Sequence, residues 1–155
     1  MQIRRAKAVD LPKLNDLLYQ VAQVHHVGRP DIFRSYFKKY SDEELLKLIE
    51  DDNCPIFVGE IDGEVVCHLY CIIKEVKNNS CLEDMRTLYI DDFCVDEKHR
   101  GQKIGQQMYA FIKEWAKENG FYNITLNVWS CNPTALKFYE KMGLLPQKIG
   151  MEEIL

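Results

Sequence analysis

The sequence lacks the features that direct a chain into or across a membrane. No stretch approaches the roughly 18 consecutive apolar residues of a spanning helix. The opening residues, MQIRRAKAVDLPKL, contain no apolar segment like that of a secretory signal peptide. No Lys/Arg-rich stretch offsets the net charge of −4, which argues against a nucleic-acid-binding protein. Together these absences predict a cytoplasmic protein that binds neither membranes nor nucleic acids.

The six cysteines do not have the spacing of a metal site. Without an export signal we expect reduced thiols rather than disulfides. The one close group is Cys67, His68 and Cys71, and no second pair follows at ligand spacing. Residues 67 and 71 would share a face of a strand, so a Cys/His metal protein stays the weakest alternative. We expect buried apolar thiols and no bound metal.

The composition is that of an ordinary globular protein. The chain has 155 residues, of which 46% are hydrophobic and 28% are charged. No repeat, linker or low-complexity segment divides it, so we predict a single domain over residues 1–155. Its mild acidity is compatible with a cationic substrate, although it is more often only a solubility feature.

Capping and turn signals divide the first half of the chain. MQIRRAKAVD predicts a short strand, and Asp10 is expected to cap the helix that follows. Ser41 and Glu44 form a capping-box pattern at the start of a second helix. PIFVGEIDGEVVCHLYCIIKEV then predicts two strands joined by a tight turn at Asp62 and Gly63.

The second half alternates strands and helices. MRTLYIDDFCV predicts a strand, and a one-faced helix runs from Ile104 to Asn119 and Gly120. YNITLNVW predicts a strand, and Asn132 and Gly143 mark the start and stop of a last helix. We expect the tail, QKIGMEEIL, to add a final strand.

This order, β-α-α-β-β-β-α-β-α-β, predicts an α/β fold. The strands joined by tight turns pair antiparallel, whereas the strand–helix–strand unit over residues 86–128 requires a parallel pair with a right-handed crossover. The sheet is therefore mixed and mostly antiparallel, with helices flanking it.

The loop HRGQKIG joins a strand to a helix and has the composition of a phosphate site. A helix N-terminus presents unpaired backbone amides, and glycines at 101 and 105 permit close approach of an anion. Arg100 and Lys103 add positive charge. Many strand–helix turns bind nothing, so the loop alone leaves that alternative open. The Walker and dinucleotide-binding motifs are both absent.

Three motifs in the right order resemble the GNAT superfamily of acetyl-CoA-dependent N-acetyltransferases. RGQKIG resembles its R/Q-x-x-G-x-G/A pyrophosphate loop, and YIDDFCVDEKHRG looks like its acidic fourth strand. NVWSCNPTALKFYEKMGL is similar to its N-x-x-A-x-x-F-Y-x-K-x-G-F segment, with matches at Asn132, Ala135, Phe138, Tyr139, Lys141 and Gly143 and with Leu144 in place of the final Phe. The motifs lie in the last two thirds of the chain.

The resemblance implies a cofactor and the residues that hold it. In that family the fourth strand carries a bulge and splays from its parallel neighbour, and acetyl-CoA fills the gap. Applied to this chain, the cofactor-binding residues are Phe93, Cys94 and Val95 of the strand, Arg100, Gly101, Gln102, Lys103, Ile104 and Gly105 of the loop, and Asn132 beside the pantetheine arm. The resemblance implies no metal, and dimers are common in the family.

It also implies direct attack of a primary amine, of a small molecule or a peptide, on the thioester. Tyr139 is expected to act as the acid toward the leaving sulfur, and Asp91 as a base acting through water. Asp92 is expected to bind a cationic acceptor. Adjacent residues of a regular strand face opposite sides of the sheet, so only one of the two carboxylates should reach the acetyl group unless a bulge re-aims them.

One departure from the family pattern falls in the loop. Lys103 stands where the family has its first loop glycine, and we expect a helical φ there, with the side chain turned away from the phosphates. This substitution leaves open a non-catalytic acetyl-CoA sensor or scaffold of the same fold. The family usually recognises its acceptor with the first two helices and their connection, a region that here holds His25, His26, Arg29, Asp31, Phe33 and Tyr36.

Overall fold

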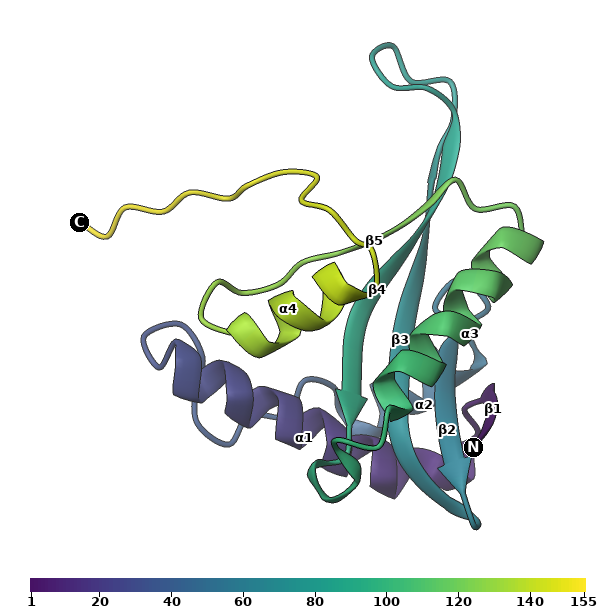
Figure 1. The fold of residues 1–155 in the computed structure, drawn as a ribbon, viewed down its shortest axis with the longest axis vertical. Helices are drawn as coiled ribbons and strands as arrows, with labels where there is room; N and C mark the ends of the chain where they lie inside the picture. Colours follow the sequence, from purple (N-terminus) through teal and green to yellow (C-terminus); the bar gives the residue numbers. More distant parts are fainter.

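The computed structural model describes residues 1–155 and contains one five-stranded sheet and four α-helices (Figure 1). In chain order the elements are β1 (Gln2–Arg5), a short 3-10 helix (Ala8–Asp10), α1 (Leu11–Gly28), α2 (Asp42–Glu50), β2 (Ile56–Ile61), β3 (Glu64–Val76), β4 (Met85–Val95), a second 3-10 helix (Glu97–His99), α3 (Ile104–Glu118), β5 (Asn123–Leu126) and α4 (Pro133–Lys141).

The sheet has the predicted mixed topology. Its spatial order is β1-β2-β3-β4-β5, and every neighbouring pair is antiparallel except β4 and β5. The parallel pair is joined by α3, as the strand–helix–strand pattern predicts. The α/β class and the mostly antiparallel sheet are therefore confirmed.

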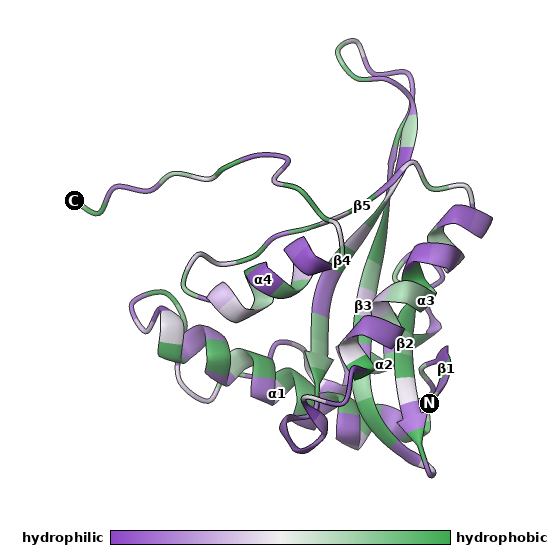
Figure 2. Ribbon diagram, in the orientation of Figure 1, coloured by the Kyte–Doolittle hydropathy of each residue, from purple (hydrophilic) through white to green (hydrophobic).

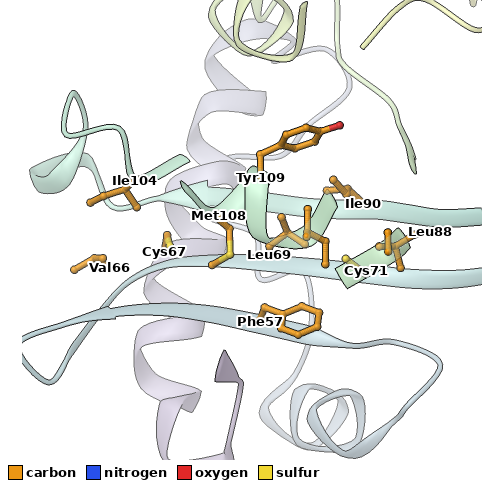
Figure 3. Close-up of a cluster of buried hydrophobic side chains, with 12 residues drawn as sticks. Phe57, Val66, Cys67, Leu69, Cys71, Leu88, Ile90, Ile104, Met108 and Tyr109 are labelled. Atoms are coloured by element: carbon orange, nitrogen blue, oxygen red, sulfur yellow. The ribbon is translucent and has the colours of Figure 1, made fainter. Parts of the chain in front are cut away.

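Helices cover both faces of the sheet and bury two apolar clusters. α3 and α4 lie on one face, where Leu69 of β3 and Met108 of α3 are fully buried (Figures 1 and 3). α1 and α2 lie on the other face, where Leu14 and Leu45 pack against Val58 of β2. Figure 2 shows that β2 and β3 are mostly apolar along their lengths, which is expected of strands covered on both faces.

Local capping signals place most helix ends correctly. The Ser41 side chain accepts from the amide of Glu44, and both halves of the predicted capping box are formed. Asn132 accepts from the amide of Ala135 at the start of α4. Gly143, just past the end of α4, has a φ of 91°, which glycine adopts without strain.

Two of the local predictions are wrong. Asp10 precedes α1 but does not cap it, because its carboxylate accepts from Arg4 at 2.7 and 2.9 Å and from the amide of Lys7. The tail forms no strand: residues 144–155 have no regular structure and run away from the sheet (Figure 1). None of the helices has both the length and the apolar character needed to cross a bilayer.

Met108 holds α3 on the sheet, and its truncation should be costly. We expect Met108→Ala to lower the free energy of unfolding by ~2–5 kcal/mol, because it removes a fully buried side chain and leaves a cavity. Urea unfolding followed by circular dichroism measures the change. The exposed neighbour variant Gln107→Ala is the control; equal losses in both would contradict this account of the core.

Candidate active site

A cleft opens where β4 continues beyond the end of β5. Parallel pairing joins only Thr87–Ile90 with Asn123–Leu126, so residues 91–95 have no strand neighbour on that side. The chain leaves β5 toward α4 instead (Figure 1). This confirms the splayed parallel pair. The cleft has a volume of about 2730 Å³, larger than the roughly 300–1,000 Å³ of a typical small-molecule site, because it extends from the 98–105 loop to α1 and the tail.

β4 carries one extra residue beside this cleft. Its register with β3 shifts there, and Asp91 is left without a cross-strand partner. The shift resets the alternation of the strand: Ile90 before it and Phe93 after it both pack on the α3 face. Asp91 and Asp92 therefore lie together on the α1 side. The opposite facing expected of a regular strand does not apply here, because the bulge re-aims the two side chains. We call these two carboxylates the acid pair.

Other side chains converge on the acid pair. The Nζ of Lys39, from the connection between α1 and α2, lies 2.9 Å from Asp91 Oδ2 and 3.2 Å from Asp92 Oδ2. The Tyr40 hydroxyl donates to the same Asp91 oxygen at 3.0 Å. His68 Nε2 lies 2.7 Å from Asp92 Oδ1. An ionised carboxylate only accepts, so this ring nitrogen must carry hydrogen.

The two carboxylates differ in environment. The side chain of Asp92 is 4% exposed, whereas that of Asp91 is 23% exposed. Burial by itself would raise the pKa of Asp92, but the hydrogen bond from His68 and the attraction of Lys39 hold the pKa below its ordinary value. Asp92 is thus a fixed, buried negative charge, and Asp91 is the member that a ligand can reach.

The backbone of the 98–105 loop is left-handed at two positions. Gly101 has a φ of 81° and Lys103 a φ of 62°. The expectation of a helical φ at Lys103 is therefore wrong. This region is costly for a residue with a Cβ, by ~1–2 kcal/mol. The loop has kept the conformation that suits a glycine, and Lys103 adopts it under strain.

The loop presents unpaired donors at the start of α3. The first amide of the helix to find a backbone acceptor is that of Gln107, which donates to the carbonyl of Lys103 at 3.1 Å; the amides of residues 104–106 have none. Arg100 is close by, and its Nε donates to the carbonyl of Val95 at 3.2 Å. Free amides beside a guanidinium suit an anion such as a phosphate.

The remaining loop residues have structural roles. A Cβ at Gly105 would lie 3.3 Å from the Phe138 ring and 3.6 Å from Val95, so this glycine allows α3 to pack against α4 and β4. Ile104 is buried in the core, while Gln102 is exposed.

The strand residues ahead of the loop differ in what they offer. The Phe93 ring packs 5.8 Å from that of Phe138. Cys94 is buried on the α1 face, so it can offer a ligand only its backbone.

Tyr139 lines the same cleft from α4. Burial, and to a lesser extent the nearby groups Asp92 and Tyr109, raise the pKa of Tyr139. Its hydroxyl is therefore protonated throughout the physiological range and can act as a hydrogen-bond donor. The N-cap residue Asn132, which also lines the cleft, fixes the first turn of the helix that carries it.

Three of the six cysteines, Cys67, Cys71 and Cys94, are core residues, whereas Cys81 is exposed, so the expectation of buried thiols holds only in part. All six are free, and Cys67 and Cys71 are buried against α3, on the face opposite to His68. Burial raises the pKa of Cys67 to about 12, so the thiol is protonated at neutral pH. No group of three or more His, Cys, Asp or Glu side chains is arranged to hold a metal ion.

Sequence reasoning missed an aromatic wall at the α1 end of the cleft. We use this name for His25, Phe33, Phe37 and Trp129. The Phe33 ring lies 4.9 Å from His25, 6.1 Å from Phe37 and 5.1 Å from Trp129. Three of these residues lie in the helix–connection region already implicated in acceptor recognition, and His25 and Phe33 were named there, but Trp129 comes from the loop after β5.

Other residues of that region point elsewhere. Arg29 is paired with Asp31 and with Glu152 of the tail. His26 Nδ1 lies 2.7 Å from the carbonyl of Phe33, and Tyr36 is 79% exposed. Lys39, Tyr40 and His68 were not predicted as site residues, because nothing in their local sequence indicates that they meet at Asp91 and Asp92.

Comparison with known proteins agrees with this geometry. The family described as "Acetyltransferase (GNAT) family" matches residues 22–144. Glucosamine 6-phosphate N-acetyltransferase of Arabidopsis thaliana is 24% identical over 98% of this chain and 95% of its own length. Streptothricin acetyltransferase A of Bacillus subtilis is 26% identical over 70% of this chain and 58% of its own length.

A solved structure has the same fold throughout. The crystal structure of a single-residue variant of the BH1408 protein from Bacillus halodurans is 28% identical and superposes with a TM-score of 0.95. The match covers 100% of this chain and 99% of that one. With a family match over most of the chain and the splayed, acidic cleft in place, the protein belongs to the GNAT family of acetyltransferases.

Proposed function

We propose that this protein transfers the acetyl group of acetyl-CoA directly onto a primary amine of a small molecule or a peptide. The observation that carries the proposal is the meeting of the acid pair, Tyr139 and the free edge of β4 in one cleft. Support also comes from relatives named for acetylating glucosamine 6-phosphate and streptothricin. The acceptor's amine then attacks the thioester beside the acid pair.

The residues present fit acetyl-CoA at the other end of the cleft. The loop from Arg100 to Gly105 would hold the pyrophosphate with its free amides and the guanidinium. The unpaired backbone edge at Phe93, Cys94 and Val95 would bind the pantetheine arm. Asn132, which caps α4 and lines the cleft, would also contact that arm. The cofactor supplies the activated acetyl group.

The chain's own groups would handle the proton and the charge. An alkylamine with a pKa of ~10.4 is almost fully protonated at neutral pH, so it must lose a proton before it can attack. Asp91 is the accessible carboxylate and would take this proton through water, because a carboxylate is a weak base for an alkylammonium. Asp92, held ionised by His68, would orient the ammonium.

Tyr139 would stabilise the leaving thiolate. Its raised pKa keeps the hydroxyl protonated but disfavours complete transfer of the proton to sulfur, so its role is chiefly that of a hydrogen-bond donor. A backbone amide of the free β4 edge would meet the developing charge on the carbonyl oxygen. We propose that no metal takes part and that the protein acts in the cytoplasm, where its buried thiols remain reduced.

Removal of the Tyr139 hydroxyl tests the function. We expect free-thiol release from acetyl-CoA with one class in a panel of primary amines, and a loss of about tenfold or more in kcat in Tyr139→Phe. Tyr122→Phe, at an exposed tyrosine, is the matched control. Calorimetry should show unchanged affinity for acetyl-CoA in both variants. Tight binding of acetyl-CoA without thiol release for any amine would favour a sensor or scaffold. A protein that does not bind acetyl-CoA would overturn the proposal.

The strained loop residue offers a second prediction. Lys103→Gly should be more stable than Lys103→Ala by up to ~1 kcal/mol, because both lose the charge but only alanine keeps a Cβ at positive φ. Thermal and urea unfolding measure the stability of the two variants. Calorimetric titration should show that Lys103→Gly binds acetyl-CoA at least as tightly as Lys103→Ala does. Equal stability of the two would mean that the loop is relaxed at this residue.

We also propose that the protein forms a homodimer through its tail. The apolar side chains of Leu145, Ile149, Met151 and Ile154 are all at least 77% exposed, and the tail extends away from its own sheet (Figure 1). An apolar extended segment of this kind is costly to leave in water and suits burial against a second copy.

Deletion of residues 145–155 should therefore convert a dimer into a monomer. Size-exclusion chromatography with light scattering measures the mass, and circular dichroism checks that the shortened chain stays folded. Since α4 ends before the deleted residues, the shortened chain should keep its fold. A full-length chain that is monomeric at every concentration would contradict the dimer.

A further inference from the structure

Lys39 brings to the acid pair the same chemical group as a protonated primary amine. Its ammonium lies 2.9 Å from Asp91 and 3.2 Å from Asp92, within hydrogen-bond distance of both carboxylates. Lys39 lines the same cleft as Tyr139 and Arg100. An acceptor whose amine is to meet the acid pair must therefore approach the oxygens that Lys39 already holds.

Three of the four carboxylate oxygens of the acid pair are already hydrogen-bonded. Asp92 Oδ1 is bound to His68, and Asp91 Oδ2 accepts from both Lys39 and Tyr40. Two ammonium groups on the same oxygens would repel each other at a site that is largely buried. An acceptor amine that is to bridge both carboxylates must therefore replace Lys39 on these oxygens.

The chain can release this cation. Lys39 lies between α1 and α2 in a connection, residues 29–41, that has no helix or strand, and its side chain is 31% exposed. Burial would lower the pKa of Lys39, but the charges of Asp92 and Asp91 outweigh it and raise the pKa. The Lys39 amine therefore stays protonated, so it serves as a counter-ion to the acid pair and is a poor nucleophile.

The aromatic wall stands beside the same carboxylates. His25 is close enough to Asp92 and Lys39 to interact electrostatically with both, and its ring packs on that of Phe33. Phe37 and Trp129 extend this surface along the cleft. Arg29, which lines the cleft beside the wall, is already paired with two carboxylates. The surroundings favour an apolar or aromatic body over a phosphorylated one.

We propose that the ammonium of Lys39 occupies the subsite of the acceptor's amine, and that the acceptor, a primary amine with an apolar or aromatic body, displaces it. This inference rests on the proposed function and names the substrate class of that site. Lys39 then lowers the apparent affinity for every amine, because only the molecules in which Lys39 has left the acid pair can bind an amine there.

Displacement can be followed in the unaltered protein. With the protein saturated with coenzyme A, phenethylamine is titrated while the side-chain NMR signals of ¹³C-labelled lysines are recorded, the Lys39 signal being assigned by its loss in Lys39→Arg. The Lys39 signal should move toward that of a solvated lysine as the amine binds. Lys38, an exposed neighbour paired with Asp42, should not respond, and phenethyl alcohol, which lacks the ammonium, should cause no shift.

Removal of the ammonium should strengthen amine binding. We expect Lys39→Met to lower the Kd and KM for phenethylamine by about tenfold, with the affinity for coenzyme A unchanged, and Lys39→Arg to keep the native value or raise it. Lys38→Met is the matched control, since it removes a charge from the same segment without touching the acid pair.

The two proposals fail in different ways. A Lys39 signal that stays fixed while the amine binds and is acetylated would overturn the displacement and leave the acetyltransferase function standing. A failure of phenethylamine to bind, with turnover of other amines, would overturn the substrate class. Failure of coenzyme A and acetyl-CoA to bind at all would sink the proposed function itself.

Discussion

The site depends on one register shift in β4. Without it, the alternation of the strand would send Asp91 and Asp92 to opposite faces of the sheet, one toward α3 and one toward α1. The extra residue puts both carboxylates on the α1 side and directly follows Ile90, the last β4 residue that pairs with β5. The same short stretch thus aims the acidic side chains and frees the backbone edge that opens the cleft.

Placing a carboxylate at Asp92 makes demands on the surrounding fold. A nearly buried charge is unfavourable unless it is paired and hydrogen-bonded. His68 of β3 and Lys39 of the connection meet this need from opposite sides. His68 is itself fully buried, and its Nδ1 has no partner. The fold therefore buries a polar imidazole whose one protein hydrogen bond goes to Asp92, which is reasonable for a site residue but not for a packing residue.

The sequence predicted most features that depend on neighbouring residues and missed those that depend on distant ones. The capping box at Ser41, the cap at Asn132 and the turn at Gly143 involve groups at most four residues apart, so local patterns find them. The prediction that Asp10 caps α1 failed because Arg4 and the amide of Lys7 take up its carboxylate.

Resemblance to a family extended the prediction to the loop, Tyr139 and the acid pair. It did not predict the backbone conformation of Lys103, the residue that departs from the family pattern. Lys103 adopts a left-handed φ because the loop on either side is fixed by Arg100 and by the start of α3. Lys39 reaches the acid pair across more than 50 residues of sequence, through a connection without regular structure. No local pattern encodes such a contact.

The cleft carries opposite charge at its two ends, and β4 separates them. At the loop end, free amides and Arg100 suit an anion; at the α1 end, Asp91 and Asp92 suit a cation. The proposed cofactor and acceptor need this arrangement, since one carries phosphates and the other an ammonium. The loop end is built from backbone that follows directly from β4. The α1 end is completed by side chains of α1, its connection to α2 and the loop after β5. Changes in those side chains can therefore alter which amine is accepted without disturbing the part of the fold that holds the acetyl donor.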